Sequence, residues 1–450
     1  MRDNNFITEN NAKHLWHPMG APGDSINNPP KVITKADGSQ ISDIDGHTTV
    51  DAVGGLWCVN LGYSNDAIKE AISEQLNHLP YYSGFAGTTN PAAIEASYMV
   101  TEMFKADGME RVFFTSGGSD SVETCLRLAR QYHRLRGEPT RTKFISLKKG
   151  YHGTHFGGAS VNGNNRFRIA YEPLLPGCFH LPSPYTYRNP FNETDPKKLA
   201  LNIVQAFEDE IAFQDKNTIA AFIMEPIQGA GGVIVPDASF MGLMQEVCER
   251  NGILMISDEV ITGFGRTGSW SGARHWNVKP DMMSMAKGIT SGYFPVGAAL
   301  MSGKVASVFF FFSSAGAGIF YGYMFSAHSL GAAAVCACLS ETQRISTKDN
   351  AGVRGKQLYE GIQRLKKKFD IIGDVRGGQG LMAAIEVVSD PNKKTPMDMD
   401  TMKKLHQKTY EAGAMVRLGL NNILMSPPLV ISETEIDQIL DALDYGFSSI

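Results

Sequence analysis

Between about residues 110 and 301, short apolar runs alternate with glycine-rich turns or amphipathic helical segments. The runs are continuously apolar rather than alternating, which is typical of strands covered on both faces. This pattern predicts strands at 111–115, 143–147, 219–224, 253–257 and 281–286. We therefore expect an α/β fold with a mostly parallel central sheet between helices. Active groups should gather at the carboxyl ends of its strands.

After residue 326 the pattern changes to long helical segments and short strands. Helices are predicted at 327–346, 351–369 and 398–412 and from residue 433, with strands near 373–376, 381–387, 414–417 and 423–426. This mixture indicates a smaller α+β domain. Before residue 60, Asp-Gly turns separate short strand candidates. We therefore predict a segment 1–59 that packs with the small domain, a large domain 60–326 and a small domain 327–450.

Composition and charge exclude several classes of protein. The 450 residues suffice for two structural units around a cleft. The formal net charge is -4 and no basic cluster alternates with aromatic residues, so no nucleic-acid partner is expected. The longest apolar run, 305–312 with one serine, is too short to cross a bilayer. The first residues lack the apolar core of a secretory signal.

The cysteines and histidines predict neither disulfides nor a metal site. Six cysteines show no Cys-x-x-Cys spacing and are too sparse for a disulfide scaffold, which favours a reducing, cytoplasmic location. His14 and His17 are three residues apart, as are His152 and His155. Neither pair has an acidic or cysteine partner in a recognised metal pattern, so no metal is expected.

One lysine and one aspartate stand at the ends of neighbouring predicted strands. Lys287 closes the run that begins at residue 281, and Asp258 follows the run 253–257. A lysine amine near a buried carboxylate is the pair that pyridoxal phosphate (PLP) chemistry requires. The amine forms a Schiff base and the carboxylate keeps the pyridine nitrogen protonated. Taken alone, a solvated strand end and a helix start remain the simpler explanations.

A second motif has the features of a phosphate site. Ser116-Gly-Gly-Ser-Asp-Ser121 lies between the strand 111–115 and apolar residues that recur at helical spacing. It presents backbone amides, hydroxyls and the positive end of a helix dipole. It lacks the P-loop lysine and the three-glycine spacing of a dinucleotide site. For this motif alone, a tight turn with Ser119 or Asp120 as N-cap is equally good.

Two further strand ends carry residues that suit a flat ring. Gly150-Tyr-His-Gly153 follows the strand 143–147, so Tyr151 could stack on a heteroaromatic ring. Glu225 and Gln228 follow the strand 219–224 and should lie at the same edge. Val260 could cover the opposite ring face. Considered singly, a loop tyrosine and a core valine are the alternatives.

Together, Ser-Gly-Gly-Ser-Asp, Tyr-His-Gly, Glu-Pro-Ile-Gln-Gly, Asp-Glu-Val and Ala-Lys-Gly have the order and approximate spacing seen in class III aminotransferases. The chain resembles that family over nearly its whole length, especially the amine:pyruvate (omega) aminotransferase branch. The resemblance implies fold type I and a homodimer, possibly a tetramer, with PLP at the subunit interface. It implies that seven residues serve the cofactor: Lys287 as Schiff-base lysine, Asp258 at the pyridine nitrogen, Tyr151 and Val260 on the ring faces, Gly118 and Ser119 at the phosphate, and Glu225 in a supporting role.

The chain departs from the family pattern at two places. Ser116–Ser121 stands where the family commonly reads Asn-Ser-Gly-Ser-Glu-Ala, and small residues are kept. In the segment 321–328, the resemblance places Tyr323 and Met324 at the cofactor phosphate of the other subunit. Met324 stands where the family usually has a threonine, so a hydroxyl is missing. We therefore expect looser cofactor retention.

The resemblance also implies a substrate pocket walled by Trp57, Phe85 and Tyr151, with Arg417 as a mobile carboxylate-binding arginine. The implied activity is transfer of an amino group from a primary amine or omega-amino acid to a keto acid, with pyruvate expected, in ping-pong steps. Donors such as γ-aminobutyrate, β-alanine or taurine remain open. A PLP-dependent decarboxylase or aminomutase and a non-catalytic PLP-binding protein are further alternatives.

Overall fold

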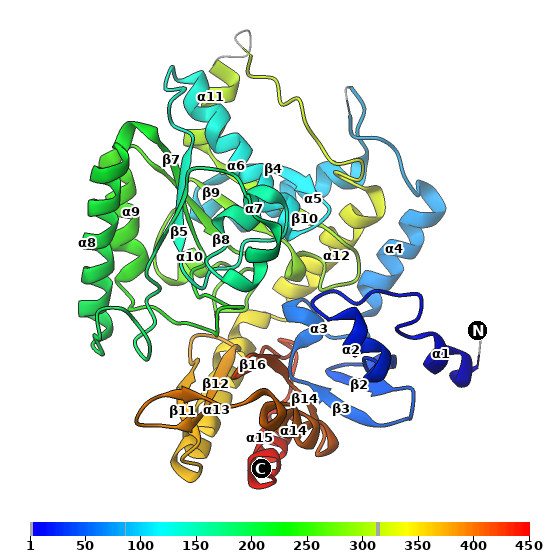
Figure 1. The fold of residues 1–450 in the computed structure, drawn as a ribbon. Helices are drawn as coiled ribbons and strands as arrows, with labels where there is room; N and C mark the ends of the chain where they lie inside the picture. Colours follow the sequence, from blue (N-terminus) through cyan, green and yellow to red (C-terminus); the bar gives the residue numbers. More distant parts are fainter. Residues whose placement is uncertain (1–2, 86, 312–315) are drawn as a thin grey trace.

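The computed structural model describes residues 3–85, 87–311 and 316–450, and a seven-stranded sheet lies at its centre (Figure 1). The strand order is β4-β10-β9-β8-β7-β5-β6. Within the part of the chain that the structure describes, β10 pairs antiparallel with β4 and β9, and the other pairs of this sheet are parallel. The strands are β4 (Met109–Thr115), β5 (Lys143–Leu147), β6 (Cys178–Leu181), β7 (Ile219–Met224), β8 (Leu254–Asp258), β9 (Met282–Met285) and β10 (Gly297–Ser302).

The predicted mostly parallel sheet is confirmed, and the five predicted strands correspond to β4, β5, β7, β8 and β9 with small shifts at their ends. β7 and β9 are buried at every position, which explains their continuously apolar sequences. β6 and β10 were not predicted from the sequence. β6 is a half-buried edge strand, and β10 contains Ala298 and Ala299, which are weak strand formers.

Helices cover both faces of this sheet. On one face, Phe222 and Met224 of β7 pack in a cluster with residues of α5 (Pro91–Met103), α8 (Pro196–Gln214), α9 (Phe240–Asn251) and α12 (Ser329–Arg344). On the other face, Ala221 and Ile223 pack against α6 (Gly118–Leu135), α7 (Phe156–Val161) and α11 (Gly303–Phe311). Alternate residues of a buried strand thus serve two cores. Three further helices are α3 (Gly54–Trp57), α4 (Asp66–His78) and α10 (Gly272–His275).

A second unit joins the two ends of the described chain. β3 pairs in parallel with β14 in the four-stranded sheet β1-β2-β3-β14, so strands before residue 60 share a sheet with the C-terminal part. Their bounds are β1 (Ile33–Asp37), β2 (Gln40–Asp43), β3 (Thr48–Asp51) and β14 (Ala414–Met415). The short helices α1 (Asn4–Asn10) and α2 (Pro22–Asn27) lie beside this sheet in Figure 1.

An antiparallel sheet completes the C-terminal part, with order β11-β12-β16-β15 and β13 paired to β12. Its strands and helices are β11 (Ile372–Arg376), β12 (Ala383–Asp390), β13 (Thr395–Pro396), β15 (Arg417–Gly419), β16 (Asn422–Met425), α13 (Thr347–Lys368), α14 (Met399–Glu411) and α15 (Glu433–Ser448). The domain limits at 59/60 and 326/327 stay a prediction. No helix within the described residues is long and apolar enough to cross a membrane.

Candidate active site

A cavity of about 220 Å³ lies where the carboxyl ends of β4, β5, β7, β8 and β9 meet. These strands are parallel, so the segments that follow them converge at one edge of the sheet. Seven of the predicted residues line the cavity: Gly118, Ser119, Tyr151, Glu225, Asp258, Val260 and Lys287. Leu56, Val122, His152, Gly153, Ile261 and Ala286 complete its lining.

One residue, Ala286, separates Lys287 from the end of β9, and Lys287 has a φ of 50°. Its conformation is uncommon for a residue with a side chain and turns the chain out of the strand. Burial lowers the pKa of the Lys287 amine, and the negative charge of Asp258 opposes that shift. The amine therefore loses its proton more readily than a lysine in water.

Asp258 is the last residue of β8 and is 3% exposed. One carboxylate oxygen, Oδ2, lies 2.7 Å from Nδ1 of the buried His152, and Oδ1 accepts a hydrogen bond from the Val260 amide at 3.2 Å. His152 Nε2 has no hydrogen-bond partner among the described residues. From the sequence, His152 was considered only as a metal ligand, so its contact with Asp258 was not predicted. The position of His152 in the same motif as Tyr151 is the sequence feature that could have indicated this contact.

Glu225 fixes the loop that carries Tyr151. Its Oε1 accepts a hydrogen bond from the Tyr151 amide at 2.9 Å, and its Oε2 accepts one from the Gly229 amide at 2.8 Å. Burial raises the pKa of Glu225 to about 7, and Asp258 adds to the rise while His152 opposes it. Glu225 thus positions the backbone and titrates near neutral pH.

Glu259, the second acid of the Asp-Glu pair, turns away from the cavity. Its Oε1 accepts hydrogen bonds from Ser257 Oγ and the Ala273 amide, and its Oε2 accepts them from Thr262 Oγ1 and the Gly272 amide. These donors tie the chain after β8 to the start of α10. Only the first acid of the pair faces the cavity.

The start of α6 leaves its backbone amides uncapped. Gly117 is the N-cap residue and no side chain accepts a hydrogen bond there, so the alternative of Ser119 or Asp120 as N-cap is wrong. The Ser119 hydroxyl instead accepts a hydrogen bond from the Thr154 amide at 3.1 Å, and Asp120 Oδ2 accepts one from the Ser116 amide. An uncapped helix start with a neighbouring hydroxyl is a ready anion site.

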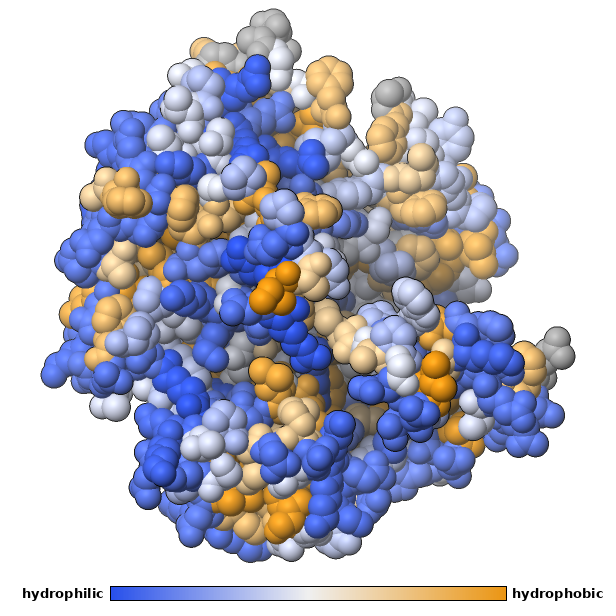
Figure 2. Space-filling view, in the orientation of Figure 1, coloured by the Kyte–Doolittle hydropathy of each residue, from blue (hydrophilic) through white to orange (hydrophobic). Residues whose placement is uncertain are grey.

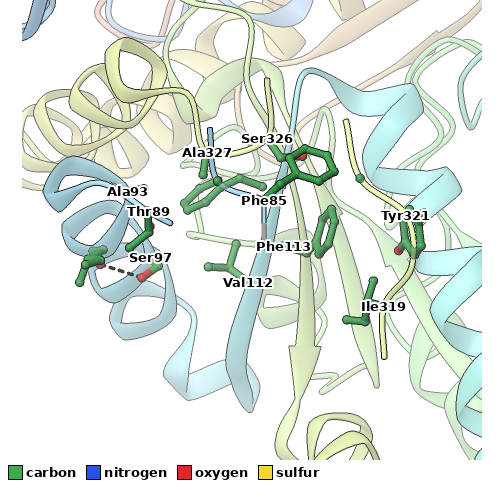
Figure 3. Close-up of a pocket in the computed structure, with 14 residues that line it drawn as sticks. Phe85, Thr89, Ala93, Ser97, Val112, Phe113, Ile319, Tyr321, Ser326 and Ala327 are labelled. Carbon is green, nitrogen blue, oxygen red and sulfur yellow. Dashed lines mark hydrogen bonds between the residues drawn. The ribbon is translucent and has the colours of Figure 1, made fainter. Parts of the chain in front are cut away.

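Two of the three predicted wall residues, Trp57 and Phe85, lie outside this cavity, whereas Tyr151 lines it. Trp57 is 3% exposed and packs with Ile227 and Ile261, whereas its neighbour Leu56 lines the cavity. The reason is local: Gly55 and Leu56 have non-helical backbone angles, so α3 kinks and turns the indole inward. Phe85 lines a separate surface pocket, where Figure 3 shows it beside Phe113.

The segment 316–328 also lies outside the cavity. The Tyr323 hydroxyl donates a hydrogen bond to the Asp120 carbonyl at 3.1 Å, which places this ring at the first turn of α6. The Met324 side chain is exposed, and its carbonyl accepts a hydrogen bond from the Tyr81 hydroxyl at 3.0 Å. The structure therefore brings Tyr323, but not Met324, next to the helix start that would hold a phosphate.

Arg417 begins β15 and lines a neighbouring cavity rather than the one around Lys287. Burial lowers the pKa of its guanidinium, and Tyr151 opposes that shift. Arg417 and Phe167 line the same cavity and the Phe167 ring contacts the Tyr151 ring, so Arg417 lies on the Tyr151 side of the first cavity. A change of rotamer would bring the guanidinium of this long side chain into either cavity.

The residues of the first cavity fit PLP. They supply a buried amine, a buried carboxylate, an uncapped helix start and a serine hydroxyl. Val260 packs closely against Gly118, because a Cβ at Gly118 would lie 3.0 Å from Val260 Cγ1. Within 3–85, 87–311 and 316–450, no group of three His, Cys, Asp or Glu side chains is placed to hold a metal.

Comparisons with known proteins identify the family of the chain. The family model Aminotransferase class-III matches residues 23–445. Putrescine–pyruvate aminotransferase of Pseudomonas aeruginosa is 33% identical, over 91% of this chain and 89% of that protein. Gamma aminobutyrate transaminase 3 of Solanum lycopersicum is 33% identical, over 95% and 82%.

Solved structures show the same fold. A PLP-bound amine transaminase from an uncultivated Pseudomonas species superposes with a TM-score of 0.94 at 42% identity, over 97% of this chain and 98% of that one. The predicted α/β fold type I and the predicted cofactor are therefore confirmed. This chain belongs to the class III aminotransferases and is a PLP-dependent transaminase.

Proposed function

We propose that this transaminase moves an amino group from a primary amine or omega-amino acid to a keto acid, with pyruvate as the acceptor. The observation that carries the proposal is the meeting of Lys287 and Asp258 in one cavity, with the cationic Arg417 beside it. Lys287 and Asp258 serve the cofactor chemistry, and a cation beside them would bind the carboxylate of the keto acid without being needed by an uncharged donor. The putrescine–pyruvate relative supports pyruvate as acceptor.

The chemistry divides between the cofactor and the chain. Bound PLP supplies an aldehyde and an electron-accepting pyridine ring. We assign Lys287 as the residue that holds the cofactor and then moves a proton with its Nζ, because burial favours the neutral amine. We assign Asp258 to hold the proton on the ring nitrogen. Its contact with His152 fixes the carboxylate for that role.

The remaining cavity residues bind and orient. Ser119 and the uncapped amides of α6 suit the cofactor phosphate. Tyr151 and Val260 would contact the two faces of the ring, and Glu225 holds the Tyr151 loop in place. Arg417 would bind the keto-acid carboxylate in two parallel hydrogen bonds. Trp57 and Phe85 stay proposed as wall residues.

The donor is the less determined half of the proposal. The putrescine and γ-aminobutyrate relatives are equally similar to this chain at 33% identity, so γ-aminobutyrate, β-alanine and taurine remain second candidates.

A matrix of donors and acceptors tests the function. We expect putrescine and simple primary amines to be converted with pyruvate faster than with 2-oxoglutarate, measured as carbonyl product and alanine. A clear preference for 2-oxoglutarate would overturn the pyruvate assignment. In the Arg417→Ala variant, we expect the keto-acid half-reaction to fall much more than the amine half-reaction. Equal losses in both would refute the role of Arg417.

We also propose that the enzyme works as a homodimer. Apolar side chains are exposed around the Phe85 pocket, and the upper right of Figure 2 shows hydrophobic residues where Figure 1 places the segment between α4 and α5. Phe85 and Ile94, which line that pocket, are exposed, and so are Leu76, Tyr82 and Tyr98 in the same part of the chain. Patches of this kind mark protein interfaces. Light scattering should therefore give a mass of twice that of one chain. The cytoplasmic location and the possible tetramer stay predictions.

A further inference from the structure

A second cavity, of about 290 Å³, adjoins the cofactor cavity on the side of Tyr151. The Phe167 ring contacts the Tyr151 ring with their centres 4.9 Å apart, and Phe167 lines the second cavity while Tyr151 lines the first. The two aromatic rings therefore form the wall between the cavities. Residues from β12, β15 and the segments after β5 and α7 surround the second cavity.

Cations dominate this second cavity. Lys149, Arg166, Arg188 and Arg417 line it, and Glu386 is its acidic residue. Glu386 is already engaged: Oε1 accepts hydrogen bonds from Arg188 Nε at 2.6 Å and Asn421 Nδ2 at 3.2 Å, and Oε2 accepts them from the Tyr185 hydroxyl and Arg376. Its negative charge is thus committed to Arg188 and Arg376.

The other three cations are not paired with an acid. Among the described residues, no side chain makes a hydrogen bond or ion pair with Lys149 Nζ or with the guanidinium groups of Arg166 and Arg417. Burial lowers the pKa of Lys149 and of Arg417, and neighbouring arginines lower each further, while Glu386 opposes the shift at Lys149. Like charges around a shared, partly desolvated space repel one another, and a bound anion would offset that repulsion.

We propose that this cavity is an outer carboxylate-binding site, where Lys149 and Arg166 capture the anionic keto acid before Arg417 passes its carboxylate to the cofactor cavity. This inference rests on the proposed function. The shared residue is Arg417, since it lines the outer cavity together with Phe167, whose ring contacts Tyr151 of the inner one. The volume of about 290 Å³ accommodates a short-chain carboxylate. Free phosphate would satisfy the same charges, so the test separates the two anions.

Binding is measured by calorimetry on the PLP-loaded enzyme, which has no amino group to transfer, with pyruvate, inorganic phosphate and acetone as probes. We expect pyruvate to bind more tightly than phosphate and acetone not to bind. Combining Lys149→Gln with Arg166→Gln should weaken pyruvate binding by about tenfold or more. Lys149→Arg, which keeps the charge, should bind pyruvate as the wild type does. Lys148→Gln is the matched control, because Lys148 is exposed beside Lys149 and does not line the cavity.

The kinetic readout is the second-order rate constant of each half-reaction. The Lys149→Gln and Arg166→Gln combination should lower that of the keto acid more than that of the amine, and added salt should shrink the difference. Three results would overturn the site: unchanged pyruvate binding in the combined variant, binding lost only in Arg417→Ala, or phosphate bound as tightly as pyruvate. The titration needs no turnover. It therefore decides the outer site even if the donor matrix shows another acceptor.

Discussion

At the scale of single residues, the burial of Glu225 makes stability depend on pH. Burial raises the pKa of this carboxyl from 4.5, the ordinary value of a solvated glutamate, to about 7 in the fold. Between these values the folded protein holds a proton that the unfolded chain releases. The free energy of unfolding should therefore fall as pH rises from about 4.5 to 7, by at most about 1.4 kcal/mol per pH unit from this group. Above pH 7 its contribution is constant.

Denaturant unfolding of the cofactor-free protein at several pH values checks this, with Glu225→Gln as the comparison. The variant cannot titrate, so its stability should decline less steeply than that of the wild type below pH 7. It also places an amide where two backbone amides donate, so it should be less stable overall. Parallel pH profiles for the two proteins would contradict the raised pKa.

A second residue-scale prediction concerns Met324. If its position faces the cofactor phosphate of the other subunit, Met324→Thr should add a hydrogen bond to a charged group, worth roughly 1.5–3 kcal/mol. Cofactor loss during dialysis, followed by absorbance, should slow by about tenfold or more. Met324→Val is the control, because valine has the shape of threonine without its hydroxyl. Equal rates of cofactor loss in the two variants would show that the side chain at position 324 does not contact the phosphate.

At the scale of elements, the junction between β4 and α6 determines the shape of the cofactor cavity. In Gly118→Ala, the new Cβ would meet Val260 Cγ1 at 3.0 Å and Cγ2 at 3.2 Å, so Val260 would be pushed into the cavity. We expect PLP affinity to fall by about tenfold, since overpacking costs typically 1–3 kcal/mol. Gly117→Ala is a matched control, because its Cβ would meet nothing within 4 Å. A fluorescence titration of the cofactor-free proteins measures the PLP affinity of both variants. Equal affinities for Gly118→Ala and Gly117→Ala would contradict the prediction.

The same elements show what the sequence can predict. Buried parallel strands have continuous apolar runs, so five strands and the residues at their ends were predictable from the pattern. β10 was missed because small residues fill a strand that crosses the sheet antiparallel to its neighbours. The contact between His152 and Asp258 joins residues 106 positions apart, so no local pattern reports it. The inward turn of Trp57 depends on a kink that only the three-dimensional backbone reveals.

At the scale of the whole molecule, Arg266, in the segment after β8, joins the segment after α3 to the loops that flank β12 and β16. It is fully buried, its Nη1 donates to the carbonyls of Leu381 at 2.9 Å and Pro427 at 2.6 Å, and its Nη2 donates to Asn60 Oδ1 at 2.9 Å. The Leu381 amide donates in return to the Arg266 carbonyl at 2.9 Å. This one side chain therefore satisfies acceptors from segments that are far apart in the sequence.

Arg266→Met keeps most of the side-chain volume but leaves those buried acceptors without donors. We expect it to lower the free energy of unfolding by about 3 kcal/mol or more, since each charged hydrogen bond contributes roughly 1.5–3 kcal/mol. Arg364→Met is the control, because Arg364 is exposed on α13. Urea unfolding at one fixed protein concentration compares the three proteins, which matters for an enzyme proposed to be a dimer. If Arg266→Met unfolds at the wild-type midpoint, these three segments are held together by their apolar contacts and not by this arginine.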